Sequence, residues 1–299
     1  MHITLVDLDS EHPGLLASYI VETERSLLVF DPGPASTIAS LLKQLAGREE
    51  KKVYVFVTHV HLDHAGGLGH LLEHVKVERV YVHERGVKHL LDPSRLWESS
   101  LSVLGERALI WGKPKPVDPE VVEEVRGDSR VELDSLTVEV VNCEGHASHQ
   151  VCYYLQDGTI FPGDALGEVY DGNVLLLTPP PFLGSEALAT IDRILRLNPE
   201  RLALPHYGIY TREHRLCNRY KAKLLEALCL AALHQGDVSK LHEHLARDEE
   251  YRRGLEVLES RDRDLAKGFL ERNITGLVEY VSSYGWYCPG KDFNAVRKG

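Results

Sequence analysis

Several features that would each indicate a particular class of protein are scarce in this chain of 299 residues. There is a single methionine and little glutamine, a thinning of thermolabile residues that favours a thermophile source. No apolar run approaches the ~18–20 residues of a membrane span. The N-terminus lacks the basic region and apolar stretch of a secretory signal. We therefore expect a cytoplasmic protein with no membrane contact.

Positive charge is also in short supply. Lysine and arginine number 34 against 45 aspartates and glutamates, a formal net charge of −11. Affinity for nucleic acid rests largely on lysine and arginine contacts to phosphate. We therefore expect no broad phosphate-binding face and no nucleic acid partner. The remaining composition, 43% hydrophobic and 26% charged, is ordinary for a soluble globular protein.

The cysteines show no pattern of a disulfide framework. They are five, odd in number and unclustered: Cys143, Cys152, Cys217, Cys229 and Cys288. Such a set is typical of buried intracellular thiols. For Cys143, three residues before His146, we favour a place in a strand core over a role as ligand or nucleophile.

Strands and helices alternate over the first two thirds of the chain. Residues 53–57 are almost continuously apolar, as in a strand covered on both faces. Further strands are predicted at residues 2–8, 18–22, 27–31, 79–82, 130–133, 136–142, 151–156, 159–161 and 201–204. Helices are predicted at residues 36–46, 68–75 and 185–197, with two more within 84–130.

The pattern of apolar residues changes near residue 211. Apolar residues then recur at helical spacing over 212–235, 238–247 and 262–284. We expect a catalytic domain at residues 1–211 and a helical C-terminal extension at 212–299. The extension is either a lid over the substrate site or the surface of a homodimer, because both need an apolar stripe.

A dense cluster of metal-ligating side chains follows the apolar run 53–57. His59, His61, Asp63 and His64 fall within six residues, and imidazole with carboxylate is the ligand set of Zn, Fe or Mn sites. In extended backbone His59 and His61 point to the same side. Asp63 and His64 then fall where a helix begins and face from another angle. The segment can serve two adjacent ions but cannot complete either coordination sphere.

Three later residues can complete these spheres, and each directly follows an apolar strand. They are His146 after residues 137–142, Asp164 after 159–161 and His206 after 202–204. Side chains at strand ends meet at one rim of a sheet, where active sites of α/β proteins form. A glycine or proline beside each allows the backbone to turn there.

The series HxHxDH, GH, GD and PH, in this order and at strand ends, resembles the metallo-β-lactamase-fold superfamily. Its glyoxalase II-like and lactonase-like hydrolases are the most similar in pattern. The resemblance covers about residues 1–210 and implies an α/β (α+β) fold, a four-layer αββα sandwich of two mixed sheets flanked by helices. The ligands that it implies for a first ion are His59, His61 and His146. Those for a second ion are Asp63, His64 and His206.

The resemblance also implies that Asp164 bridges the two ions and that Asp31 supports the site from behind, unless it only caps the Pro-Gly turn. Zn is the default metal, and Fe or Mn fit the same ligands. Two such ions would provide a bridging hydroxide to cleave a small ester, thioester or lactone. Asp63 would orient the nucleophile and carry a proton. Tyr207, beside His206, would stabilise the oxyanion or serve only in packing.

Other functions stay open at this point. The main rival is a mononuclear iron dioxygenase acting on a persulfide, and a phosphodiesterase or nuclease is less favoured. A metal-stabilised interaction protein without turnover is a third. The segment from Gly145 to His149 departs from the GHTPGH of many family members, which leaves the role of His149 open. We expect the substrate pocket within residues 84–130 and 166–183, where no motif identifies the substrate.

Overall fold

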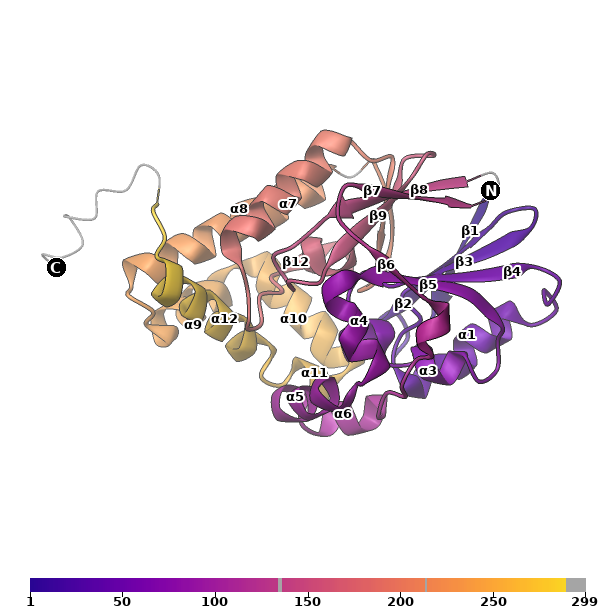
Figure 1. Cartoon of the computed structure of the whole chain (residues 1–299). Helices are drawn as coiled ribbons and strands as arrows, with labels where there is room; N and C mark the ends of the chain where they lie inside the picture. The colour runs from indigo at the N-terminus through magenta and orange to yellow at the C-terminus, as the bar shows by residue number, and fades with distance from the viewer. Residues whose placement is uncertain (134–135, 213, 289–299) are drawn as a thin grey trace, which may run out of the picture.

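The protein is built from two six-stranded sheets that pack face to face, with helices on both outer faces (Figure 1). The computed structural model describes residues 1–133, 136–212 and 214–288. The predicted four-layer αββα sandwich is confirmed. Glu213 and residues 289–299, which belong to the predicted C-terminal extension, lie outside the described part of the chain.

The first sheet runs in the order of the sequence. Its strands are β1 (His2–Asp7), β2 (Ala17–Glu22), β3 (Ser26–Phe30), β4 (Lys52–Phe56), β5 (Val77–His83) and β6 (Val122–Val125). The first three are antiparallel, whereas β3 to β6 pair in parallel. Parallel neighbours place the C-terminal ends of β3, β4 and β5 at one edge of the sheet.

The second sheet is mostly antiparallel. Its spatial order is β14 (Gly208–Thr211), β13 (Arg201–Leu204), β10 (Thr159–Phe161), β9 (Val151–Leu155), β8 (Leu136–Asn142) and β7 (Ser129–Leu133). Only the β10–β13 pair is parallel. A separate hairpin of β11 (Glu168–Tyr170) and β12 (Asn173–Leu175) follows β10.

An aromatic layer fills the space between the sheets. Phe30 of the first sheet stacks on Phe161 of the second with ring centroids 3.7 Å apart. Phe56 packs edge-on against Tyr153, whose buried hydroxyl donates to the carbonyls of Val57 and Tyr81. The opposite faces of the strands carry aliphatic residues that pack under the helices. Because both faces of β4 are buried, its sequence is almost continuously apolar.

The helices before the extension are α1 (Ile38–Leu45), α2 (Leu62–Ala65), α3 (Leu68–Leu71), α4 (Glu84–Leu91), α5 (Ser94–Leu104), α6 (Glu106–Trp111) and α7 (Gly184–Leu197). Three helices therefore stand where two were predicted between residues 84 and 130. Strands β6, β11, β12 and β14 were not predicted, because each is short and lies at an edge or in a separate hairpin.

The C-terminal extension consists of α8 (His214–Leu233), α9 (Val238–Arg247), α10 (Glu249–Arg261), α11 (Arg263–Ala266) and α12 (Phe269–Tyr284). The helix predicted over residues 262–284 is divided at Gly268, which adopts a positive φ of 71°. Helix α12 packs on the segment before α7, where Thr178 donates its backbone N–H to Asn273. The close approach is possible because Gly276, facing the Thr178 carbonyl, has no side chain.

The expectation of free thiols is wrong for four of the five cysteines. Disulfides join Cys143 to Cys152 and Cys229 to Cys288, with Cα atoms 5.6 Å and 5.3 Å apart. Antiparallel pairing of Val141 with Cys152 brings Cys143 near its partner, while packing of the extension brings Cys288 to α8. Neither contact shows as clustering in the sequence. Among the described residues, no helix is long and apolar enough to span a membrane.

Candidate metal centre

All seven predicted ligands lie together at the edge of the sandwich where strands end. His59 and His61 follow β4, Asp63 and His64 lie in α2, and His146 follows the β8 strand. Asp164 lies in a 3-10 turn after β10, and His206 follows β13. Two groups form, each with its ligand atoms within 4.8 Å of one another: His59, His61, His146 and Asp164; and Asp63, His64 and His206.

Asp164 stands between the two groups. One carboxylate oxygen lies 3.6 Å from Nε2 of His59 and 3.3 Å from Nε2 of His146. The other oxygen lies 3.2 Å from Nε2 of His64 and 3.4 Å from Nε2 of His206. The buried carboxylate thus turns one oxygen toward the histidines of each group.

Three imidazoles of the first group point at one another. Nδ1 of His61 lies 3.1 Å from Nε2 of His59 and 3.1 Å from Nε2 of His146. The outer nitrogens of the other two rings have partners: the Thr58 hydroxyl lies 3.1 Å from His59, and the Leu177 carbonyl lies 3.4 Å from His146. Such outer contacts orient ligating rings and select their tautomers.

The second group is supported by carboxylates. The same Asp63 oxygen lies 3.7 Å from Nε2 of His64 and 3.5 Å from Nε2 of His206. Behind His64, Nδ1 lies 2.9 Å from Asp31, which also accepts the backbone N–H and hydroxyl of Thr58 at 2.7 Å each. These contacts favour the supporting role of Asp31. Glu168, which the sequence did not single out, lies 3.9 Å from Nδ1 of His206.

Buried polar atoms at the centre remain without hydrogen bonds among the described residues. They include Nε2 of His64, Nε2 of His206 and one oxygen of Asp164. Buried polar groups without partners are rare because each costs free energy. A divalent cation would satisfy all three at once, so the residues present fit a metal site.

The two groups differ electrostatically. Burial, with a further effect of His146, lowers the pKa of His61 to about 4, so its imidazole is neutral and available as a ligand. Burial also acts to lower the pKa of His206, but Glu168 and Asp164 outweigh it and raise that pKa to about 9. The carboxylates therefore attract positive charge to the second group. A divalent ion would supply positive charge there in place of a proton.

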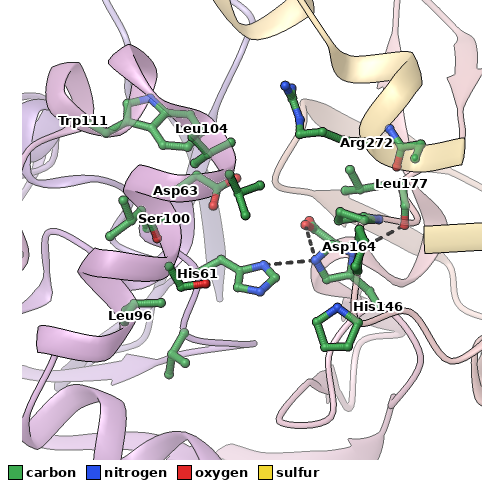
Figure 2. Close-up of a pocket in the computed structure, with 18 of the residues that line it drawn as sticks. His61, Asp63, Leu96, Ser100, Leu104, Trp111, His146, Asp164, Leu177 and Arg272 are labelled. Atoms are coloured by element: carbon green, nitrogen blue, oxygen red, sulfur yellow. Dashed lines mark hydrogen bonds and ion pairs between the residues drawn. The ribbon is translucent and has the colours of Figure 1, made fainter. Parts of the chain in front are cut away.

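A cavity of about 290 Å³ opens over the centre (Figure 2). His61, Asp63, His146 and Asp164 lie at its base, and Leu96, Ser100 and Leu104 of α5 form one side. Leu177 lies on the other side (Figure 2), and Pro179, Pro180 and Pro181 also line the cavity. The lining thus includes both segments predicted to form the pocket.

The extension also contributes to this cavity. Leu265 of α11 and Phe269, Arg272 and Asn273 of α12 line it. This placement agrees with the lid alternative for the extension. No sequence motif marks these residues, because their contact with the cavity depends on how the extension packs.

Tyr207 lies elsewhere. It is absent from the cavity lining, and its hydroxyl donates to Asp7 at 3.1 Å. The ring packs against the aromatic layer between the sheets. The geometry therefore favours packing over the predicted contact with an oxyanion.

His149 lines the cavity but belongs to neither ligand group. Its ring centroid lies 5.7 Å from that of His61. Burial, with a further effect of His61, lowers the pKa of His149 to about 2, so the ring is neutral. His149 therefore offers one N–H donor and one acceptor beside the centre.

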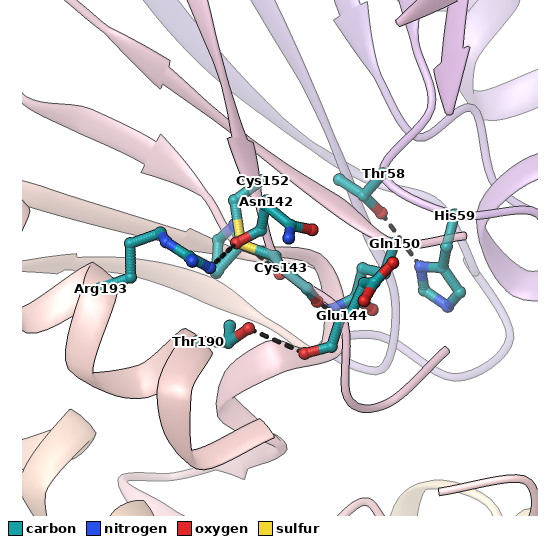
Figure 3. The surroundings of a disulfide bond; sticks show 10 residues. Thr58, His59, Asn142, Cys143, Glu144, Gln150, Cys152, Thr190 and Arg193 are labelled. Atoms are coloured by element: carbon teal, nitrogen blue, oxygen red, sulfur yellow. Dashed lines mark hydrogen bonds between the residues drawn. A yellow bond between two sulfur atoms is a disulfide. The ribbon is translucent and has the colours of Figure 1, made fainter. Parts of the chain in front are cut away.

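The loop that carries His146 and His149 is closed by a disulfide. Cys143 and Cys152 join its two ends, and Gln150 donates to the Cys143 carbonyl at 3.2 Å (Figure 3). Helix α7 holds the loop from outside through Arg193 and Thr190, which donate to the carbonyls of Asn142 and Glu144. Cys143 is therefore a structural residue, neither ligand nor nucleophile.

Comparison with known proteins identifies related chains. The family model described as the metallo-beta-lactamase superfamily matches residues 13–206. The metallo-beta-lactamase fold-containing protein ST1585 of Sulfurisphaera tokodaii is 29% identical over 203 residues, 67% of this chain and 75% of that protein. Its crystal structure, recorded for Sulfolobus tokodaii, has a TM-score of 0.70 and covers 93% of this chain and 98% of that one, at 23% identity.

Two further relatives have a named activity or metal. The hydroxyacylglutathione hydrolase of Albidiferax ferrireducens is 25% identical over 192 residues, which is 62% of each chain. The structure of TTHA1623 in a di-iron-bound form has a TM-score of 0.52 and 25% identity, and covers 71% of this chain and 96% of that one.

Proposed function

The chain belongs to the metallo-beta-lactamase superfamily, and on this premise we propose that it is a dinuclear metal-dependent hydrolase of a small ester, thioester or lactone. The proposal rests mainly on Asp164, whose two carboxylate oxygens face two separate groups of ligand atoms. A single ion would not need both groups.

Each residue of the centre has a defined place in this proposal. His59, His61 and His146 would hold one ion, and Asp63, His64 and His206 the other, with Asp164 between them. The ions would supply Lewis acidity toward a carbonyl and lower the pKa of a water molecule toward neutrality. Asp63 lines the cavity, so its carboxylate can take the proton of the attacking water and pass it toward the leaving group.

The cavity supports a substrate with an apolar body. Its walls carry leucine, proline, tryptophan and phenylalanine side chains, which would exclude water from the reacting carbonyl. His149 would offer a neutral N–H beside the centre. The relatives called hydroxyacylglutathione hydrolases support thioester cleavage as one form of the reaction. We take Zn as the default metal, and Fe is the alternative that TTHA1623 supports.

Elemental analysis of the purified protein, followed by a panel of lactones, thioesters and phosphodiesters with the metal matched, tests the proposal. We expect two ions per chain and turnover of an ester, thioester or lactone. In the Asp63→Ala variant we expect loss of turnover and of metal from the second group. An exposed charge on α7, changed in Asp192→Asn, serves as the control.

Two results would contradict the proposal. One iron per chain with oxygen consumed on a persulfide substrate would identify the dioxygenase instead. Unchanged metal content in Asp63→Ala, together with no cleavage of any carbonyl substrate, would leave a metal-stabilised interaction protein.

A further inference from the structure

Arg272 of the extension lines the cavity, and no acidic side chain of the described residues lies within ion-pair distance of it. Arg272 of α12 lies on the opposite side of the cavity from Leu96, Ser100 and Leu104 (Figure 2). Its two terminal nitrogens donate to the backbone carbonyls of Leu265 and Lys267, both at 3.0 Å. Within the described ranges, no carboxylate forms an ion pair with it; Glu168 and Glu271 act only at longer range.

This arrangement is costly unless something else compensates the charge. Arg272 is partly buried, and that burial lowers its pKa from the ordinary value. The lining residues Leu265, Phe269 and Leu177 are apolar, and Glu168, which also lines the cavity, acts on Arg272 only at longer range. The two carbonyls use two of the five N–H donors of a guanidinium and fix its plane. The remaining donors can serve a further acceptor.

A second arginine lines the same cavity. Arg95 of α5 is exposed and, in the part of the chain that the structure describes, forms no ion pair. The lining also holds three carboxylates: Asp63 and Asp164 belong to the candidate ligand groups, and Glu168 lies 3.9 Å from Nδ1 of His206. Among the described residues, no carboxylate lies within ion-pair distance of either arginine, so both can bind an anionic group of a ligand.

Together these observations point to the chemistry of the substrate, and the inference rests on the function proposed above. We propose that Arg272 binds a carboxylate at the end of the substrate remote from the reacting carbonyl, with Arg95 assisting from the cavity mouth. The substrate is then an ester, thioester or lactone with an apolar body and a free carboxylate. Arginine suits this role because its planar donors match the two oxygens of a carboxylate.

A purely structural role for Arg272 predicts something different. Its contacts to Leu265 and Lys267 lie at the C-terminal end of α11, where a cation also stabilises a helix. If this were its only role, replacing Arg272 would lower stability and weaken all ligands alike. If it binds a carboxylate, replacement weakens only the ligands that carry one.

Matched inhibitors separate the two roles by binding alone. We would titrate metal-loaded protein by calorimetry with alkyl hydroxamates, which chelate the metal, ending in a carboxylate or in an uncharged carboxamide, over several chain lengths. At the best length we expect the carboxylate to bind about 10- to 100-fold more tightly. The preference should vanish in Arg272→Met and persist in part in Arg272→Lys. The exposed Arg263→Met on α11 should retain it.

The inference fails if the wild-type protein shows no preference at any length, or if Arg272→Met weakens both ligands equally. It fails independently of the proposed function. A carboxylate preference without turnover of any ester, thioester or lactone would support Arg272 and contradict the hydrolase. Turnover of such a substrate without the carboxylate preference would support the hydrolase and contradict the role of Arg272.

Discussion

The carboxylate of Asp31 and the imidazole of His64 meet behind the second ligand group, with 2.9 Å between the oxygen and Nδ1. Asp31 is itself fixed by the backbone and hydroxyl of Thr58, the residue before His59. One buried carboxylate therefore orients a ring of the second group and anchors the segment that begins the first. Partners of this kind strengthen metal binding without touching the metal.

Replacing Asp31 by asparagine should weaken metal binding. The amide keeps the size of the side chain but loses the charge and one acceptor, so His64 is less firmly oriented and less basic. We expect metal affinity to fall about 10- to 100-fold, measured by competition with a chromogenic chelator. Asp192→Asn is the control, since Asp192 is a surface partner of Lys221. Unchanged affinity in Asp31→Asn would show that the contact is dispensable.

The two disulfides should differ in their effect on the metal centre. Loss of either bond, in Cys143→Ala/Cys152→Ala or Cys229→Ala/Cys288→Ala, should lower the free energy of unfolding by roughly 2–4 kcal/mol. Only the first pair closes the loop of His146, so only its loss should also reduce metal affinity. Urea unfolding and chelator competition measure the two effects. Equal effects of both pairs on metal affinity would contradict the assignment.

A buried ion pair should hold the extension against α6. Arg107 and Asp262 lie 2.7 Å apart with their side chains 2% and 3% exposed, and Asp262 caps α11. Arg107→Met leaves the Asp262 charge without its partner, so we expect a loss of about 3–5 kcal/mol in the free energy of unfolding. The control is Arg253→Met, which breaks an exposed pair with Glu249 and should cost at most about 1 kcal/mol.

The same pair lies close to the wall of the cavity, because α11 and α12 follow Asp262 directly. Arg107→Met should therefore also weaken the binding of both hydroxamates, whatever their terminal group. A loss confined to the carboxylate ligand would be inconsistent with this role and would assign Arg107 to substrate recognition instead.

Tyr207 should be dispensable for catalysis. Its hydroxyl donates to Asp7 away from the cavity, so Tyr207→Phe removes one part-buried hydrogen bond. We expect a loss of about 1 kcal/mol in stability and unchanged kcat on the best substrate of the panel. A fall in kcat of about 100-fold or more, the effect of losing an oxyanion donor, would restore the catalytic role predicted from the sequence.

Most of the metal centre was predictable because it depends on local geometry. The spacing of His59, His61, Asp63 and His64 joins a strand end to a helix start, and this short path determines where each side chain points. His146, Asp164 and His206 each follow a strand of the second sheet. Strand ends collect at the edge of a sandwich, so these residues could be placed without knowing the packing of the helices.

The neighbours of a residue in the sequence do not determine which way its side chain points or which distant residue it contacts. Tyr207 is adjacent to His206, yet the two side chains face different parts of the molecule. The sequence of Cys143 and Cys152 likewise held no indication of a bond, because their contact depends on the register of β8 and β9. Both cases concern orientation between segments, which the residue pattern does not record.

The sequence by itself indicated the sandwich through its resemblance to a known superfamily, and it indicated the candidate ligands because each lies at a strand end or a helix start. The tertiary structure alone decided which residues close the cavity. Phe269 and Arg272 line the same cavity as Leu96 and Leu104 although more than half the chain separates the two pairs. This arrangement depends on how the apolar faces of α11 and α12 pack. The sequence does not determine that packing, because many helices have such faces.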